Sequence, residues 1–180
     1  MSLSPIKIKI LEELLLNDKP AKAIQIAKES GNDFRPTMMH LLDLARKGYV
    51  SSPEKGQFII TDKGKNALGI NGNNSESAKV ILSNVPSERA FHFYTALQRP
   101  TDTFALSLQD FVEKIQKINV ESIEFHVQRG DFESWFTFIK DDELAKKMAL
   151  LKGRNLQGEE LRQKIYTIVG DRYKALSAMN

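Results

Sequence analysis

Apolar residues recur along much of the chain at intervals of about one helical turn. Between residues 5 and 17, Ile6, Ile10 and Leu14 form one such stripe, which predicts an amphipathic helix. A polar turn ending in Pro20 follows, and a proline fits the start of the next helix, because the first helical amides have no partner inside the helix. A second, short helix is therefore predicted over residues 21–30.

A third helix is predicted after residue 33, with Pro36 in its first turn. Gly48 is expected to end this helix, because a residue without Cβ readily adopts the left-handed conformation found at helix C-termini. Its predicted apolar face consists of Met38, Leu41, Leu42 and Ala45.

Two short apolar stretches follow Gly48, and turn residues separate them. Tyr49-Val50 and Phe58–Ile60 are predicted to pair as a hairpin, with Pro53 and Gly56 in the connection. Thr61 is a suitable N-cap for another helix. Three helices followed by two strands are the order of a winged helix-turn-helix, which we predict for residues 1–70.

The second half of the chain is predicted to form a separate, mainly helical domain. Residues 69–77, GINGNNSES, have no apolar period and are rich in Gly, Asn and Ser, so a linker is expected over 71–78. Residues 79–180 then make up the second domain, and the whole chain is assigned to the mainly α class. Its expected elements begin with a short strand or linker end at 78–82 and a strand at 91–97, for which a helix is the open alternative. A turn at 100–103, a helix capped by Ser107, a segment at 123–136 broken by Gly130, a helix from Asp141 or Asp142 to about Leu151, and a helix at 158–179 follow.

Composition excludes several classes of site. The 180 residues contain no Cys, which excludes disulfides, thiolate nucleophiles and Cys-based zinc sites. No stretch reaches 18 apolar residues, so no membrane span is expected. The N-terminal segment does not resemble a signal peptide, because acidic residues interrupt its apolar run, and a cytoplasmic location is therefore expected.

Positive charge is concentrated in the first part of the chain. Residues 1–70 contain 11 Lys and Arg against 8 Asp and Glu, whereas residues 71–180 contain 15 of each. A duplex is a dense line of phosphates, so a basic surface raises affinity and association rate without selecting a sequence. A basic surface that is merely solvated would give the same counts, so both interpretations stay open.

The segment LLDLARKGYV followed by FIITDKGKNAL resembles the recognition helix, wing and following helix of archaeal and bacterial winged-helix regulators. Phe58, Ile60, Thr61 and Gly64 occupy the positions of that pattern. In a helix-turn-helix, residues early in the third helix reach base edges, while basic residues at its end and on the wing contact phosphates. The candidate DNA-binding residues are Arg35, Thr37, His40, Arg46, Lys47, Lys55, Gln57, Lys63 and Lys65.

The second half, over roughly residues 88–166, resembles an uncharacterised archaeal domain family of unknown function. The resemblance rests on FHFYTAL, SLQDF, SIEFH with the following RGDF, Trp135, and DDELAKKM, and it departs from the family at Ala96, where Gly is frequent. It implies a mainly helical domain, often joined to helix-turn-helix units, and no particular activity.

One polar cluster in this half could form a partner or ligand site. Its candidate residues are His92, His126, Arg129, Asp131 and Trp135. A His beside a carboxylate can act in acid–base catalysis, but no His-containing metal-helix spacing is present. Asp131 could simply cap a helix, Arg129 and Glu133 could pair on a helix surface, and His126 among apolar neighbours fits a hydrogen-bonded structural residue.

The sequence therefore predicts a DNA-binding protein that regulates transcription, with double-stranded DNA as its partner. The C-terminal domain would serve dimerisation, a protein partner or a ligand. An alternative is a protein-interaction module that uses the winged helix as a docking surface, and a weaker one is an enzyme or metal site around His126. The expectation is a non-enzyme without cofactor or metal. A homodimer and a protein partner both stay open.

Overall fold

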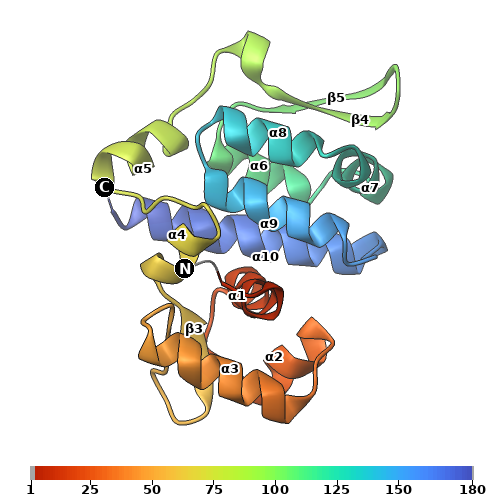
Figure 1. Ribbon diagram of the computed structural model, residues 1–180. Helices are drawn as coiled ribbons and strands as arrows, with labels where there is room; N and C mark the ends of the chain where they lie inside the picture. The colour runs from red at the N-terminus through yellow and green to blue at the C-terminus, as the bar shows by residue number, and fades with distance from the viewer. Residues whose placement is uncertain (1–2, 180) are drawn as a thin grey trace. The chain divides into compact units, whose positions relative to one another are not determined.

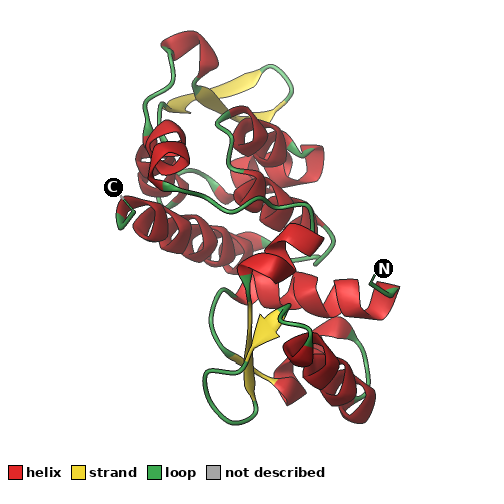
Figure 2. Cartoon of the chain, turned by 60° about the vertical axis from the view of Figure 1, so that its left-hand side comes forward, coloured by secondary structure: helices red, strands yellow, loops and turns green. Residues whose placement is uncertain are grey.

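The computed structural model describes residues 3–179 and divides into two compact units, with the boundary between Gly72 and Asn73 (Figure 1). Helices make up most of each unit, and each unit has one small antiparallel sheet (Figure 2). The predicted mainly α class is therefore confirmed. None of the helices among residues 3–179 combines the length and the apolar character needed to cross a bilayer.

The N-terminal unit contains the predicted three helices and two hairpin strands, together with one strand that was not predicted. Its elements are α1 (Pro5–Asn17), β1 (Ala21–Lys22), α2 (Ala23–Ser30), α3 (Phe34–Arg46), β2 (Val50–Ser51), β3 (Gln57–Ile60) and α4 (Asp62–Ala67). The two residues of β1 pair with β3, so the sheet has the order β1-β3-β2 and the second helix starts two residues later than predicted.

The buried face of α3 differs from the prediction. Thr37, Leu41 and Leu44 are fully buried, at helical spacing, whereas the side chain of Leu42 is 49% exposed. A threonine can occupy this buried stripe because its hydroxyl donates a hydrogen bond of 2.8 Å to the carbonyl of Asp33, one turn earlier. Leu42 was therefore wrongly assigned to the apolar face, and it points to the outer side of the helix.

Thr61 and Gly64 have distinct roles where the hairpin meets α4. The Thr61 hydroxyl accepts a hydrogen bond from the Gly64 amide, which confirms the predicted N-cap. Gly64 is needed for close packing, because a Cβ at this position would lie 2.2 Å from the carbonyl oxygen of Tyr49. The Thr-x-x-Gly pattern thus joins a helix cap to a close approach between α4 and the start of the hairpin.

The C-terminal unit begins with a helix where the sequence suggested a linker. In chain order its elements are α5 (Ser75–Leu82), η1 (Ser87–Arg89), β4 (Phe91–Ala96), β5 (Arg99–Ala105), α6 (Leu108–Ile115), α7 (Val120–Arg129), α8 (Asp131–Phe138), α9 (Asp142–Lys152) and α10 (Gly158–Ser177). Asn74 and Ser77 form a reciprocal capping box at the start of α5. The linker prediction is therefore wrong from residue 75 onward, and residues 78–82 are helical.

The β4–β5 hairpin lies on the opposite side of α6–α8 from the long helix α10 (Figure 1). The strand predicted at 91–97 is confirmed, but the turn predicted at residues 100–103 is part of β5. Pro100 suggested a turn, yet a proline is tolerated on an edge strand, which has neighbouring hydrogen bonds on one side only. Register shifts interrupt the pairing near Tyr94, so the hairpin is irregular close to its tip.

The core of the C-terminal unit is aromatic. Phe93, Phe111, Phe132 and Phe136 are fully buried, and their rings meet at mostly edge-to-face angles. Phe91 joins β4 to this cluster, with its ring 4.9 Å from that of Phe93. The helices and the hairpin thus share one core, which fixes the hairpin against α7.

A second buried cluster in this unit is ionic. The carboxylate of Asp141 caps α9 and also accepts two hydrogen bonds from the Nε and Nη2 groups of Arg172, and Arg172 contacts Glu143 at 3.0 Å. Glu143 in turn lies 2.8 Å from the Lys147 ammonium. All four side chains are buried, so each charge has a partner of opposite sign.

Candidate functional site

The surface formed by α3 and the β2–β3 hairpin holds most of the predicted DNA-binding residues. Arg35 and Arg46 lie at the two ends of α3, and both are exposed. Lys55, in the hairpin turn, is also exposed, and His40 is half-buried. Thr37 is fully buried and bonded to Asp33, so its side chain cannot reach a base edge, and we remove it from the candidate contacts.

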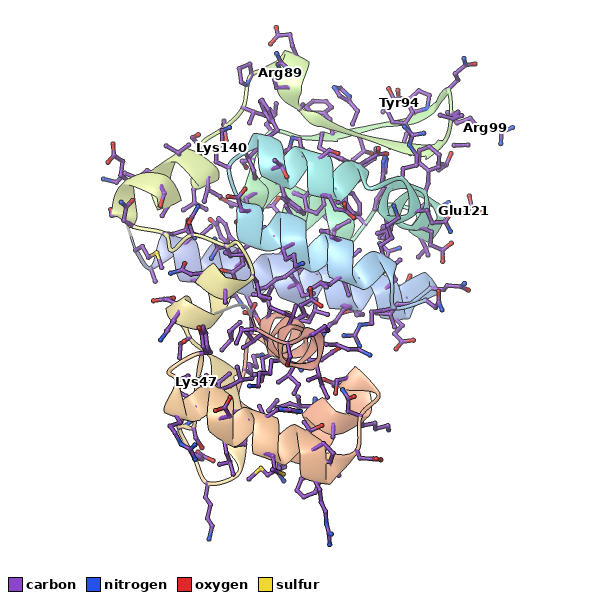
Figure 3. All side chains as sticks on the ribbon, in the orientation of Figure 1. Lys47, Arg89, Tyr94, Arg99, Glu121 and Lys140 are labelled. Carbon is purple, nitrogen blue, oxygen red and sulfur yellow. The ribbon has the colours of Figure 1, made fainter. Side chains whose placement is uncertain are left out.

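An acidic residue, Asp43, lies among the cations of α3. Its Oδ2 atom accepts hydrogen bonds from Lys7 at 2.6 Å and from Lys47 at 3.0 Å. These two hydrogen bonds lower the pKa of the Asp43 carboxyl to about 2. The charge of Lys47, which is labelled beside α3 in Figure 3, is therefore partly offset before any ligand arrives.

The remaining predicted contacts differ in how freely they can move. Lys63 donates to the carbonyl of Lys47 at 2.8 Å, and its ammonium lies 4.8 Å from the centre of the Tyr49 ring. Gln57 donates to the carboxylate of Glu54, and Lys65 is half-buried. Arg35, Arg46 and Lys55 are exposed cations of this surface, and no hydrogen bond or ion pair to another described residue holds their side chains.

Apolar side chains are also exposed on α3. Met39 is 72% exposed, and Leu42 and Phe34 are 49% and 45% exposed. Met39 and Leu42 lie between Arg35 and Arg46 on the outer side of the helix, at intervals of three or four residues. The outer face of α3 is therefore a mixed stripe with an arginine at each end and apolar residues in the middle.

The second candidate site is a pocket of about 310 Å³ between the β4–β5 hairpin and the end of α7. Figure 3 labels Tyr94 on β4, on the wall of this pocket, and Arg99 near the tip of the same hairpin. The residues that shape the pocket are His92, Tyr94, Leu97, Phe125, Arg129 and Asp131. Three of the candidate residues, His92, Arg129 and Asp131, therefore share one cavity with His126.

His126 is buried at 3% exposure, and both of its ring nitrogens are hydrogen bonded. Nε2 accepts from the backbone amide of Tyr94 at 2.8 Å, so the proton of the neutral ring is on Nδ1, which donates to Asp131 at 2.7 Å. Burial lowers the pKa of His126 below its usual value, although Asp131 opposes this shift. His126 therefore joins β4 to the α7–α8 corner as a neutral ring.

Asp131 holds two neighbours with one oxygen atom. Its Oδ2 accepts from His126 and, at 3.0 Å, from the Nε group of Arg129. The predicted capping role of Asp131 is wrong: it is the first residue of α8, and no side-chain cap is present there. The predicted Arg129–Glu133 pair does not form, because α7 ends at Arg129 and the chain turns at Gly130, whose φ is 77°.

Trp135, the fifth candidate residue of this cluster, belongs to the core. Its ring is 7% exposed and lies parallel to that of Phe111, with 5.5 Å between their centres. The indole N–H donates to the carbonyl of Arg89 at 3.2 Å, so its polar group is occupied as well. Trp135 therefore anchors the residues before β4, and it does not line the pocket.

Sequence reasoning missed the residues that supply the apolar wall of the pocket. Phe125 and Leu97 both line the pocket, and neither is among the predicted site residues. The four-residue spacing of Phe125 and Arg129 on a predicted helix was a usable signal, because such residues lie on the same face. Among residues 3–179, no cluster of three or more His, Asp or Glu side chains could hold a metal ion.

The C-terminal unit matches a known protein family. Residues 70–170, more than half of the chain, match the family of unknown function DUF5752. The chain belongs to this family. The match includes the whole β4–β5 hairpin and helices α6–α9, and therefore the pocket; of the ionic cluster it includes Asp141, Glu143 and Lys147, whereas Arg172 lies beyond it. No curated protein and no solved structure matches the chain significantly.

Proposed function

We propose that the N-terminal unit of this DUF5752 protein binds duplex DNA through α3 and the β2–β3 hairpin. The observation that carries the proposal is the exposure of Arg35, Arg46 and Lys55 on consecutive elements that follow helix-turn-helix order. Arg35 is in the first turn of α3, where side chains of a recognition helix reach base edges. Arg46 and Lys55 would contact phosphates, which set the register of the protein on the duplex.

The charge balance supports this assignment. The whole excess of positive over negative residues, 11 against 8, lies in residues 1–70. Asp43 offsets part of the charge of Lys47, so we count about four phosphate contacts: Arg46, Lys55, Lys63 and Lys65. Binding would then be modest in strength and strongly dependent on salt.

A salt titration of binding to a random-sequence duplex tests the proposal. With about four phosphate contacts, the slope of log K against log salt should be roughly −3 to −4. Lys55→Ala should weaken binding to all sequences alike and reduce the slope by about one unit, whereas Arg35→Ala should change the sequence preference. Lys174→Ala, an exposed position on α10, is the matched control and should leave the slope unchanged.

The wider role we propose is transcriptional regulation, in which the DUF5752 unit serves dimerisation, a protein partner or a ligand. Genome-wide crosslinking followed by sequencing would test it. Enrichment at promoter regions that disappears in an Arg35→Ala Arg46→Ala double variant is the expected result. A uniform distribution along the genome would contradict a regulatory role while leaving DNA binding intact.

A second candidate function is docking to a protein, and the exposed stripe of α3 favours it. Met39, at 72% exposure, and Leu42 lie between two arginines, and Met and Arg are both enriched in protein interfaces. Absence of duplex binding at low salt would exclude the DNA proposal and favour docking. In that case Met39→Gln should abolish capture of the partner, whereas Lys55→Ala should not affect it.

A further inference from the structure

The pocket between the β4–β5 hairpin and α7 contains one cation, Arg129, which is held by a hydrogen bond and still has free donors. The Nε group of Arg129 donates to Asp131, and the guanidinium lies 5.2 Å from the centre of the Phe125 ring. Within residues 3–179 no other group accepts a hydrogen bond from Arg129, so its two Nη groups remain available. A guanidinium held in this way loses little freedom when it binds a planar anion end-on.

The residue that supports Arg129 is itself hydrogen bonded through His126 to the hairpin. Asp131 is held by His126, which is buried and bonded on its other nitrogen to the backbone of Tyr94. The chain of contacts from β4 through His126 and Asp131 to Arg129 therefore sets the position of the guanidinium relative to the hairpin. His126 and Asp131 act here as positioning residues.

The walls around this cation are mainly apolar. Phe125 lies under the guanidinium, and Tyr94 and the 71% exposed Leu97 contribute the hairpin side. The volume of about 310 Å³ is at the lower end of the ~300–1,000 Å³ of small-molecule sites. The pocket therefore suits a small ligand with an apolar body and one polar end.

The charges in the pocket select the polar end. Arg129 attracts an anion, but Asp131 beside it carries a negative charge, and the buried His126 ring is neutral. A ligand with a single negative charge gains from the guanidinium and meets repulsion from Asp131. The two oxygens of a planar carboxylate match the fork of the two Nη groups.

We propose that this pocket binds a small aryl monocarboxylate, with the carboxylate on the Nη groups of Arg129 and the ring against Phe125, Tyr94 and Leu97. The site is independent of DNA binding by the N-terminal unit. It gives the DUF5752 unit a ligand-binding role, whatever the N-terminal unit binds.

Titration of the full-length, ¹⁵N-labelled protein with phenylacetate, observed by NMR, tests the proposal. Amide signals of Tyr94, Leu97, Gln98 and Arg129 should shift on addition of phenylacetate. Neutral phenylacetamide should bind at least about tenfold more weakly, because it lacks the charge-assisted pairing. Equal binding of the acid and the amide, or no binding of phenylacetate at millimolar concentration, would overturn the proposal.

Arg129→Gln should raise the dissociation constant for phenylacetate by about tenfold or more. Arg89→Gln is a matched control, because Arg89 also lies over an exposed aromatic ring, that of Phe138 at 5.5 Å, and lies outside the pocket. Leu97→Ser changes an exposed side chain and should weaken phenylacetate binding without lowering the melting temperature. If Arg89→Gln weakens binding as much as Arg129→Gln, or if Leu97→Ser has no effect, the assigned pocket is wrong.

Discussion

In the N-terminal unit, charged side chains of α3 and the hairpin lie at the surface, and Asp43 shares its one carboxylate between Lys7 and Lys47. In the C-terminal unit, Asp141, Glu143, Lys147 and Arg172 are buried together and bonded to one another. Removing one partner of a surface ion pair lowers the free energy of unfolding only slightly, because water can replace that partner. Removing one side chain of the buried cluster leaves a buried charge unpaired.

This difference explains why the count of charged residues indicates possible binding partners for the N-terminal unit but not for the C-terminal unit. The balance of 15 against 15 in residues 71–180 reflects, in part, pairs that neutralise each other inside the fold. The excess in residues 1–70 is on the surface, where it can act on a ligand. Net charge is therefore a guide to partners only where the charges are exposed.

The largest expected effect is at Arg172. Arg172→Met should lower the free energy of unfolding of the C-terminal unit by about 3–5 kcal/mol, because it leaves Asp141 buried without its main partner. Urea unfolding followed by Trp135 fluorescence measures this, since the single tryptophan lies in that unit's core. Arg89→Met, an exposed arginine, is the control and should change stability by less than about 0.5 kcal/mol. Similar stabilities for the two variants would show that the buried cluster is dispensable.

An intermediate effect is expected at His126, where the buried group is neutral. The unfolded chain takes up a proton near pH 6.5, but the folded chain resists it, because burial lowers the pKa of His126. The unfolded state then binds more protons, so this contribution to stability is complete above pH 6.5 and is lost as the pH falls below it. The urea midpoint at pH 5.5 should thus be lower than at pH 7.5.

His126→Gln should be less stable at both pH values and should show a smaller fall between them. His92→Gln, on the exposed side of β4, serves as the control and should keep the fall seen in the unchanged protein. A pH dependence that survives in His126→Gln would mean that another group is responsible.

The smallest effect on stability is expected at Asp43. This residue tests most directly whether the surface ion pairs of the N-terminal unit differ from the buried cluster of the C-terminal unit. Asp43→Asn releases Lys7 and Lys47, so duplex affinity at low salt should rise a few-fold and the salt slope should steepen by up to about one unit. The melting temperature should change little, as for most surface ion pairs.

Since the pKa of Asp43 is lowered to about 2, the stability it provides should persist above pH 4 and be lost between about pH 4 and pH 2. If Asp43→Asn melts as low as Arg172→Met, the contrast between the units is wrong.

Much of the fold followed from local signals in the sequence. Thr61, Ser107, Asn119 and Asp141 each cap a helix with the side chain, and Gly130 ends one, because these preferences depend on a few neighbouring residues. Predictions from local sequence were wrong where pairing with another strand determines the secondary structure. Two examples are β1, which exists only by pairing with β3, and β5, which includes Pro100 because it is an edge strand.

The candidate site of the C-terminal unit was predicted in part. His92, His126, Arg129 and Asp131 were chosen as a group, and the structure brings them to one pocket. The roles of Asp131 and Trp135 were not predictable from local sequence. Asp131 bonds to His126 across the break between two helices, and Trp135 bonds to Arg89, which is distant in sequence. Thr37 was misplaced for a similar reason, since a rotation of α3 by part of a turn exchanges its buried and exposed faces.

The sequence by itself determined the helical class, the positions of most helix ends, the hairpin at residues 50–60 and the concentration of positive charge before residue 70. Each of these depends on periodicity, capping preference or composition, which are properties of short segments. Only the tertiary structure decided which face of α3 is exposed, which charges are buried as partners, and that β4 and the end of α7 enclose a pocket beside Arg129. These depend on contacts between segments far apart in the chain, and no local pattern specifies them.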